Sequence, residues 1–357
     1  MRPAAYFFSI LILLTSACDD HDTSSGSCES TELSTHQTYA DLVEAVPELV
    51  VNTFIEEPNA EGALGRNKNG YLHVRFQLPM TYLVEYAIRN QDEEVLNLFV
   101  LNLSYSFDHQ TEAGDFEFVL PPDQPADQSS LAGNLLSGTA FFGYAVGISL
   151  VMLYESDWYQ QLPEDHSAKL NIDGLNAKIA LLLTFLKANI EELEQHDGMA
   201  PNRLLYDVLA LYTLAGHVKD PEAVSLALPL TQQVFHSHQP EGYFLEAGGW
   251  DSSYNGVSVK LGFELFTLLN SPNHTDLRER LAEVITCAVN WQASRILETG
   301  EISTEGNSRV YPGGESLGGI EKRVDVEKTV RAFSYMAHLS GDASYGKLLD
   351  LVLNYYD

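Results

Sequence analysis

Apolar residues recur at intervals of three and four along most of the chain, which is the spacing of one face of an α-helix. Two stretches show the pattern clearly: Leu175, Ile179, Leu182, Leu186, Ile190 and Leu193, and then Leu277, Leu281, Val284, Ala288 and Trp291. The stretches 203–215 and 254–269 are apolar nearly all round, as in helices that are buried on most sides. Strand-like alternation is nearly absent. The pattern predicts an all-α chain in which amphipathic helices alternate with buried ones.

Glycines mark the ends of the amphipathic stretches, at Gly114, Gly198, Gly242 and Gly300. Glycine commonly closes a helix, and its recurrence after similar stretches indicates a repeated helical hairpin. We expect residues 37–357 to form an α/α toroid of about five to six hairpins, as a closed or an open ring, with an α-solenoid as the alternative. In a toroid the loops 110–130, 196–202, 239–253 and 298–324 would share one rim.

The N-terminus has the features of an export signal. Arg2 precedes the apolar run 6–14, which is shorter than the about 20 residues that span a bilayer. The run Leu14-Thr15-Ser16-Ala17-Cys18 resembles the lipobox of bacterial lipoproteins. This resemblance implies that residues 1–17 are a signal peptide and that Cys18 carries a lipid. Residues 18–36 are polar and predict a disordered tether, so we expect a lipid-anchored protein of the cell envelope, in the periplasm or on the outer surface.

Composition narrows the range of partners. Apolar residues make up 45% of the chain, and the formal net charge of −30 argues against nucleic acid, which requires clustered Lys and Arg. No nucleotide-binding fingerprint or Cys/His metal spacing is present, so no cofactor and no metal are expected. Cys287 lies in a predicted helix, where a buried free thiol is the favoured interpretation and a disulfide with Cys28 is the alternative.

Two loops hold most of the candidate chemistry. Residues 241–256 contain Tyr243, Glu246, Trp250, Asp251, Tyr254 and Asn255, and residues 300–315 contain Asn307, Arg309 and Tyr311. The segments Glu241-Gly242-Tyr243-Phe244 and Tyr254-Asn255-Gly256 resemble motifs of toroidal polysaccharide lyases of the chondroitin and alginate lyase type. Those enzymes have an arginine in the next turn, where this chain has Arg309. They also have a histidine shortly after the phenylalanine. This chain has Leu245-Glu246-Ala247 there, without a histidine, so His238 is the nearest substitute.

The resemblance implies β-elimination on a uronic-acid glycan. Tyr254 would carry the proton, because a neighbouring arginine lowers the pKa of a phenol, while Arg309 and Asn307 would neutralise the uronate. Trp250, Tyr243, Asn255 and Tyr311 would bind the sugar rings.

Other interpretations stay open for the same residues. Glu246 and Asp251 could form the carboxylate pair of a glycoside hydrolase, or a lipid-anchored protein could bind or assemble glycans without catalysis. Each residue could also be structural. Tyr254 could pack in the core, Arg309 could pair with Glu305 or Glu315, Asn307 could serve a turn, and Asp251 could cap a helix.

Overall fold

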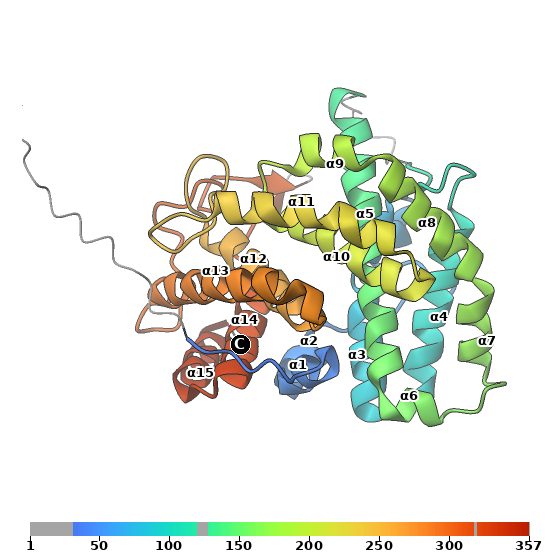
Figure 1. The fold of residues 1–357 in the computed structure, drawn as a ribbon, viewed down its shortest axis with the longest axis horizontal. Helices are drawn as coiled ribbons and strands as arrows, with labels where there is room; N and C mark the ends of the chain where they lie inside the picture. The colour runs from blue at the N-terminus through green and yellow to red at the C-terminus, as the bar shows by residue number, and fades with distance from the viewer. Residues whose placement is uncertain (1–30, 120–127, 318–319, 357) are drawn as a thin grey trace, which may run out of the picture.

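The computed structural model describes residues 31–119, 128–317 and 320–356 (Figure 1). These residues form fifteen α-helices, three short 3-10 helices and one antiparallel pair of short strands, β1 (Ser316–Leu317) and β2 (Ile320–Glu321). The all-α prediction is therefore confirmed. Cys18, the signal peptide and the first part of the tether lie outside the described residues.

Five helices that we call the core helices form the centre of the fold: α3 (Met80–Asn90), α5 (Gln128–Glu155), α10 (Pro201–Val218), α12 (Ser252–Leu268) and α14 (Val326–Ser340). Each core helix packs against the next one in this order. A second set, the covering helices, alternates with them along the chain: α4 (Glu93–Asp108), α8 (Asn176–Ala188), α11 (Pro221–Ser237), α13 (Thr275–Ser294) and α15 (Ala343–Tyr356). Each of these packs on the core helix before it.

Shorter elements complete the chain: α1 (Tyr39–Ala45), α2 (Glu48–Phe54), η1 (Gly65–Asn69), η2 (Val74–Gln77), α6 (Asp157–Gln161), α7 (Ser167–Gly174), α9 (Ile190–Asp197) and η3 (Pro272–His274). Aspartates begin many of the long helices, because their carboxylates accept the free N–H groups of the first turn. Such N-caps are Asp92, Asp220, Asp251 and Asp325.

A glycine turn of one geometry recurs along the chain. Gly114, Gly242 and Gly300 have φ angles of +100°, +98° and +93°. Each lies between two residues that form a one-pair antiparallel bridge: 110 with 116, 238 with 244, and 296 with 302. Glycine is required because its backbone is left-handed, and because a Cβ would meet a backbone carbonyl of the next covering helix, at Leu181, Cys287 and Leu351 respectively. The predicted repeat is therefore confirmed at these three positions.

The repeat differs from the prediction at two positions. Gly198 has a right-handed φ of −58° at the end of α9, so it does not form this turn. Gly62, which the sequence analysis missed, has a φ of +104°, and a Cβ there would meet the carbonyl of Leu101 in α4. All four of these turn glycines contact the middle or the C-terminal half of the following covering helix. Each turn therefore lies between the middle and the C-terminal end of the covering helix that follows it. The C-terminal end is the one from which the next turn begins.

Buried polar side chains connect the first and last core helices. Arg331 of α14 forms an ion pair with Glu85 of α3, with Nη2 and Oε2 2.7 Å apart, and Lys328 of α14 donates to the Tyr82 hydroxyl of α3 at 2.7 Å. Nearby, Tyr39 of α1 donates to Glu264 of α12, which also pairs with Lys260. In Figure 1 the helices α3 and α5 run vertically, whereas α10 and α13 run horizontally. The helices therefore do not share one direction, and this arrangement does not establish a regular ring.

Several local expectations need correction. The region 38–54, whose apolar pattern predicts one helix, forms two helices, because Pro47 ends α1 and begins α2. The expected tether is partly packed, since Leu33 is buried and the Ser34 amide donates to the Leu339 carbonyl. Cys287 is disulfide-bonded rather than free, and its partner lies outside the described residues. The segment Gly133–Glu155 of α5 is long and apolar enough to cross a membrane, but 89% of its apolar 18-residue window is buried inside the fold.

Candidate functional site

Asp251 joins the two candidate loops at the start of α12. One carboxylate oxygen accepts the amides of Ser253 and Tyr254, at 3.0 and 3.2 Å. The other accepts the amides of Arg309 and Val310, at 3.0 and 2.8 Å. Asp251 is fully buried. The expected adjacency of the two loops is therefore confirmed, and the carboxylate of Asp251 is used in holding them together.

Asn307 has a similar structural position. Its amide oxygen accepts the Ser252 amide at 2.9 Å, and its amide nitrogen donates to the Ser252 hydroxyl and the Val310 carbonyl. The side chain is buried, and these bonds occupy its polar atoms. Asn307 therefore fixes the loop against α12, and its geometry does not leave it free to neutralise a uronate as we expected.

A cluster of charged groups surrounds the hydroxyl of Tyr254, in the first turn of α12. This hydroxyl donates to Oε2 of Glu315 at 2.8 Å and accepts from the Lys322 ammonium. The guanidinium of Arg309 lies over the tyrosine ring, 4.3 Å from its centroid. Arg309 also pairs with Glu246 and with Glu315, the latter at 3.0 Å. We call these five residues the tyrosine cluster; it brings together the expected Tyr254, Arg309 and Glu246.

A strained hairpin brings Glu246 to this cluster. Glu246 and Gly249 exchange backbone hydrogen bonds around Ala247, whose φ of +51° is unusual for a residue with a side chain, and Gly248. The Ser308 hydroxyl donates to the Glu246 carbonyl at 2.7 Å, which ties the hairpin to the second loop. The Glu246 carboxylate is almost completely buried. Burial raises the pKa of Glu246, and its pairing with Arg309 offsets this only in part.

Burial governs the ionisation of the cluster. It raises the pKa of Tyr254 well above its usual range, and the Arg309 charge only partly opposes this. The expectation that arginine lowers the phenol pKa is therefore wrong for the net effect. Burial lowers the pKa of Lys322, against the charge of Glu315. Burial alone would raise the pKa of Glu315, but the Tyr254 hydrogen bond and the Lys322 charge outweigh burial and lower this pKa. At neutral pH the phenol is protonated beside an ionised Glu315.

Two more cations lie near the cluster. Arg75 of η2 packs over the Phe141 ring, 4.7 Å from its centroid, and burial together with the charge of Arg203 lowers its pKa. Arg203, at the start of α10, pairs with Asp197 at 3.1 Å. The sequence motifs did not indicate Arg75, Arg203 or Lys322 as site residues. The charged triplet 321–323 after the second loop was a usable signal for Lys322, whereas Arg75 is distant in sequence from both loops.

The remaining expected residues divide between two places. Trp250 and Tyr243 are in edge-to-face contact at 5.8 Å, and Tyr243 also contacts Trp291. Trp250 and Tyr311 are exposed. Asn255 is buried and binds the Phe244 amide and the Ala288 carbonyl, so it is not available to a ligand.

His238 lies outside the tyrosine cluster. Its ring contacts Phe244 at 5.7 Å, and burial followed by the charge of Arg280 lowers its pKa. Its Nε2 has no hydrogen-bond partner. None of the described contacts connects it to Tyr254, so the structure gives no support to His238 as the replacement for the histidine of the lyases.

Two hollows adjoin the loop 300–315. The larger, of about 670 Å³, lies between α2, the segment 301–327 and the end of α15, and Lys322 lines it. The smaller, of about 550 Å³, is lined by residues 303–307 together with Leu297, Glu301, Tyr311 and Pro312. Both volumes are typical of ligand sites, which span about 300–1,000 Å³. Among the described residues, no group of three or more His, Cys, Asp or Glu side chains is arranged to hold a metal ion.

Comparison with known proteins leaves the family open. No protein-family profile matches the chain, and a search of curated proteins found no match. The resemblance to polysaccharide lyases therefore rests on the motifs in the two loops and on the cluster that they form.

Proposed function

We propose that this protein is a polysaccharide lyase that cleaves a uronic-acid-containing glycan by β-elimination at the tyrosine cluster. One observation carries the proposal: the Tyr254 hydroxyl is held between a cation, Lys322, and a carboxylate, Glu315, with Arg309 against its ring. A proton carrier beside two cations is what removal of a proton next to a sugar carboxylate requires.

In the proposed reaction, Arg309 and Lys322 bind the uronate carboxylate and stabilise the negative charge that develops on it. Because the phenol is protonated in the free protein, it acts as a relay. Its oxygen takes the proton from C5 of the uronate while its own proton passes to Glu315. The C4–oxygen bond then breaks, a C4–C5 double bond forms, and the proton returns through Tyr254 to the leaving oxygen. The protons balance without a cofactor.

We also propose that the core and covering helices form an open α/α toroid with the tyrosine cluster at one rim. Support comes from the strict alternation of the two helix sets and from the glycine turns, each against the next covering helix. The core helices α10 and α12 begin beside the cluster, where the positive ends of their dipoles favour an anionic ligand.

For location, we propose an exported protein anchored by a lipid on Cys18. The lipobox-like run supports this proposal, and so does the disulfide of Cys287, because disulfides persist mainly in oxidising compartments.

A non-catalytic glycan-binding protein is the second candidate. The protonated phenol and the existing ion pairs of Arg309 favour it, because both are compatible with binding alone. The glycoside hydrolase is less well supported. Asp251 gives both oxygens to four backbone amides, and Glu246 is paired with Arg309, so neither carboxylate is free to act on a sugar.

The test is incubation of the full chain with a panel of acidic polysaccharides, with two readings of the products. The lyase produces unsaturated uronates, seen by their ultraviolet absorbance, together with new reducing ends in equal amount. New reducing ends without the absorbance would identify a hydrolase. Binding of a glycan with neither product would identify the non-catalytic protein and would refute the lyase.

A further inference from the structure

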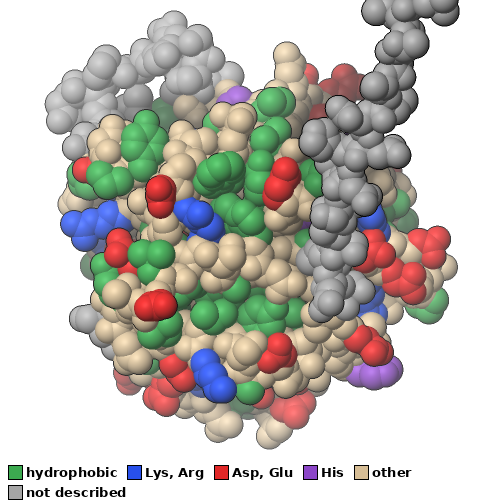
Figure 2. All heavy atoms as spheres, turned by 90° about the vertical axis from the view of Figure 1, so that its left-hand side faces the viewer, with side chains coloured by type: hydrophobic (Ala, Val, Ile, Leu, Met, Phe, Trp, Pro, Cys, Tyr) green, Lys and Arg blue, Asp and Glu red, His purple; other side chains and the backbone are tan. Residues whose placement is uncertain are grey.

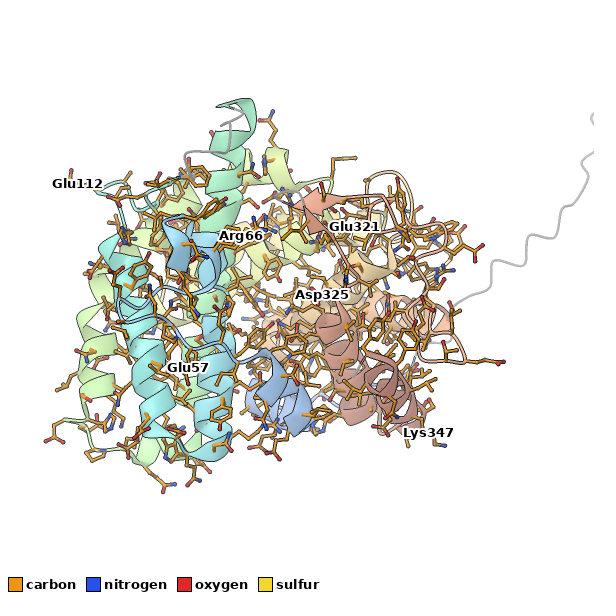
Figure 3. All side chains as sticks on the ribbon, turned by 180° about the vertical axis from the view of Figure 1, so that it is seen from behind. Glu57, Arg66, Glu112, Glu321, Asp325 and Lys347 are labelled. Carbon is orange, nitrogen blue, oxygen red and sulfur yellow. The ribbon has the colours of Figure 1, made fainter. Side chains whose placement is uncertain are left out.

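The larger and smaller hollows adjoin each other along the second loop, and together we call them the groove. They share four residues of the second loop: Glu301, Thr304, Tyr311 and Pro312. Lys322 lines the larger hollow and also bonds the Tyr254 hydroxyl, so the groove reaches the cluster at Lys322. In Figure 3, Glu321 and Asp325 lie along the segment that leads to α14, across the middle of the molecule from the segment that carries Arg66.

Exposed aromatic side chains are spaced along this groove. Phe54 and Tyr356 border the larger hollow and Tyr311 stands between the two, with exposures of 38%, 41% and 43%. Trp250 lies beyond the smaller hollow, because Gly306 of its lining approaches the indole so closely that a Cβ would be 2.7 Å from the ring. Figure 2, which presents the left-hand side of the molecule in Figure 1, shows hydrophobic side chains interspersed with carboxylates and with Lys and Arg side chains. Aromatic faces that carry a polar tip are suited to sugar rings, which have apolar faces and polar edges.

The charge of the groove changes with distance from the cluster. The smaller hollow is lined by the carboxylates Glu301 and Glu305 and by no cation. The larger hollow has four acidic residues and only two cations. These cations are Lys322, which belongs to the cluster, and its sequence neighbour Arg323. Lys322 and Arg309 therefore attract an anionic sugar at the cluster, and the carboxylates elsewhere in the groove repel it. A neutral sugar is neither attracted nor repelled by these charges.

We infer that the groove binds neutral sugar units that flank a single acidic unit held at the tyrosine cluster. The substrate class is then a heteropolysaccharide in which uronates are separated by neutral sugars, not an uninterrupted polyuronate. This inference rests on the proposed function for the position of the acidic unit. It adds the groove as a site that selects the neighbouring sugars.

Two oligosaccharides of equal length separate the alternatives: one with a single uronate between neutral sugars, and one of uronates only. Binding is measured by calorimetry at low salt with the full chain. We expect the all-uronate ligand to bind roughly tenfold more weakly, because the extra charges face the carboxylates of the groove. Replacing two of those carboxylates, Glu301→Gln with Glu305→Gln, should raise the affinity for the all-uronate ligand more than the affinity for the neutral-flanked ligand, so that most of the difference is lost.

Aromatic variants test the neutral sugars directly. Tyr311→Ala and Tyr356→Ala should each weaken the neutral-flanked ligand by roughly fivefold. Tyr154→Ala, an exposed tyrosine at a different surface, beside His217, is the control and should have no effect. Equal or tighter binding of the all-uronate ligand, or binding of neither ligand, would overturn the inference. Tight binding of the neutral-flanked ligand without unsaturated product would instead overturn the proposed lyase and leave the groove assignment standing.

Discussion

Replacement of Asp251 by asparagine is the sharpest test of how the site is built. The carboxylate accepts four backbone amides, two from the first turn of α12 and two from residues 309 and 310 of the second loop, and it is fully buried. Asparagine has the same shape but only one accepting oxygen. Asp251→Asn therefore keeps two of the four bonds and turns an amide nitrogen toward the other two N–H groups.

The expected cost follows from those bonds. A hydrogen bond to a charged group contributes about 1.5–3 kcal/mol, and a buried donor left without a partner costs about as much. Two lost bonds therefore predict a decrease of about 3–5 kcal/mol in the free energy of unfolding. Asp92→Asn is the matched control, because one oxygen of Asp92 accepts both amides at the start of α4 and asparagine caps helices equally well.

Urea denaturation, followed by far-ultraviolet circular dichroism, measures both variants. The urea midpoint should fall sharply for Asp251→Asn, whereas the free energy of unfolding of Asp92→Asn should stay within about 0.5 kcal/mol of wild type. If Asp251 were instead a catalytic carboxylate of a hydrolase, Asp251→Asn would lose activity at unchanged stability. A stability within about 1 kcal/mol of wild type would refute the structural role, because that value is less than one lost charged hydrogen bond.

Two other predictions concern the fold. Gly300→Ala should destabilise by about 3 kcal/mol or more, since left-handed strain of about 1–2 kcal/mol adds to a Cβ that would lie 2.1 Å from the Leu351 carbonyl oxygen. Gly341→Ala, also left-handed but in open space, should lose only the strain, and equal losses in urea unfolding would refute the packing argument. Burial lowers the pKa of His73 to about 4, so the unfolded chain binds its proton first. Stability should fall by roughly 3 kcal/mol as the pH drops from about 6.5 to about 4. His73→Gln should flatten that decrease, and an equally steep pH profile in the variant would contradict this assignment.

The sequence predicted the features that depend on local pattern. Helical periodicity indicated the all-α class, and glycines after amphipathic stretches marked the turns at 114, 242 and 300. The adjacency of the two loops followed from the expected repeat and is confirmed by the bonds from Asp251 to both. Gly198 was misassigned because sequence alone does not separate a left-handed glycine from a right-handed one.

Features that depend on long-range contact could not be predicted. The hydrogen bonds of Asn307 and Asn255 exist only because separate segments meet closely, so both residues had the appearance of free site residues in the sequence. Arg75 reaches the site from a 3-10 helix far from the candidate loops. The net effect on the Tyr254 pKa depends on burial, which outweighs the neighbouring arginine and is not visible in a motif.

The central claim is that Tyr254 carries the proton in β-elimination, and one measurement tests it directly. The rate of unsaturated uronate formation is compared between wild type and Tyr254→Phe on the same acidic glycan, with binding measured in parallel. Phenylalanine removes one oxygen and keeps the ring against Arg309. We predict a loss of at least about 100-fold in turnover, the usual contribution of a positioned acid or base, with binding weakened less than tenfold. Turnover by Tyr254→Phe at more than about a tenth of the wild-type rate would contradict the account.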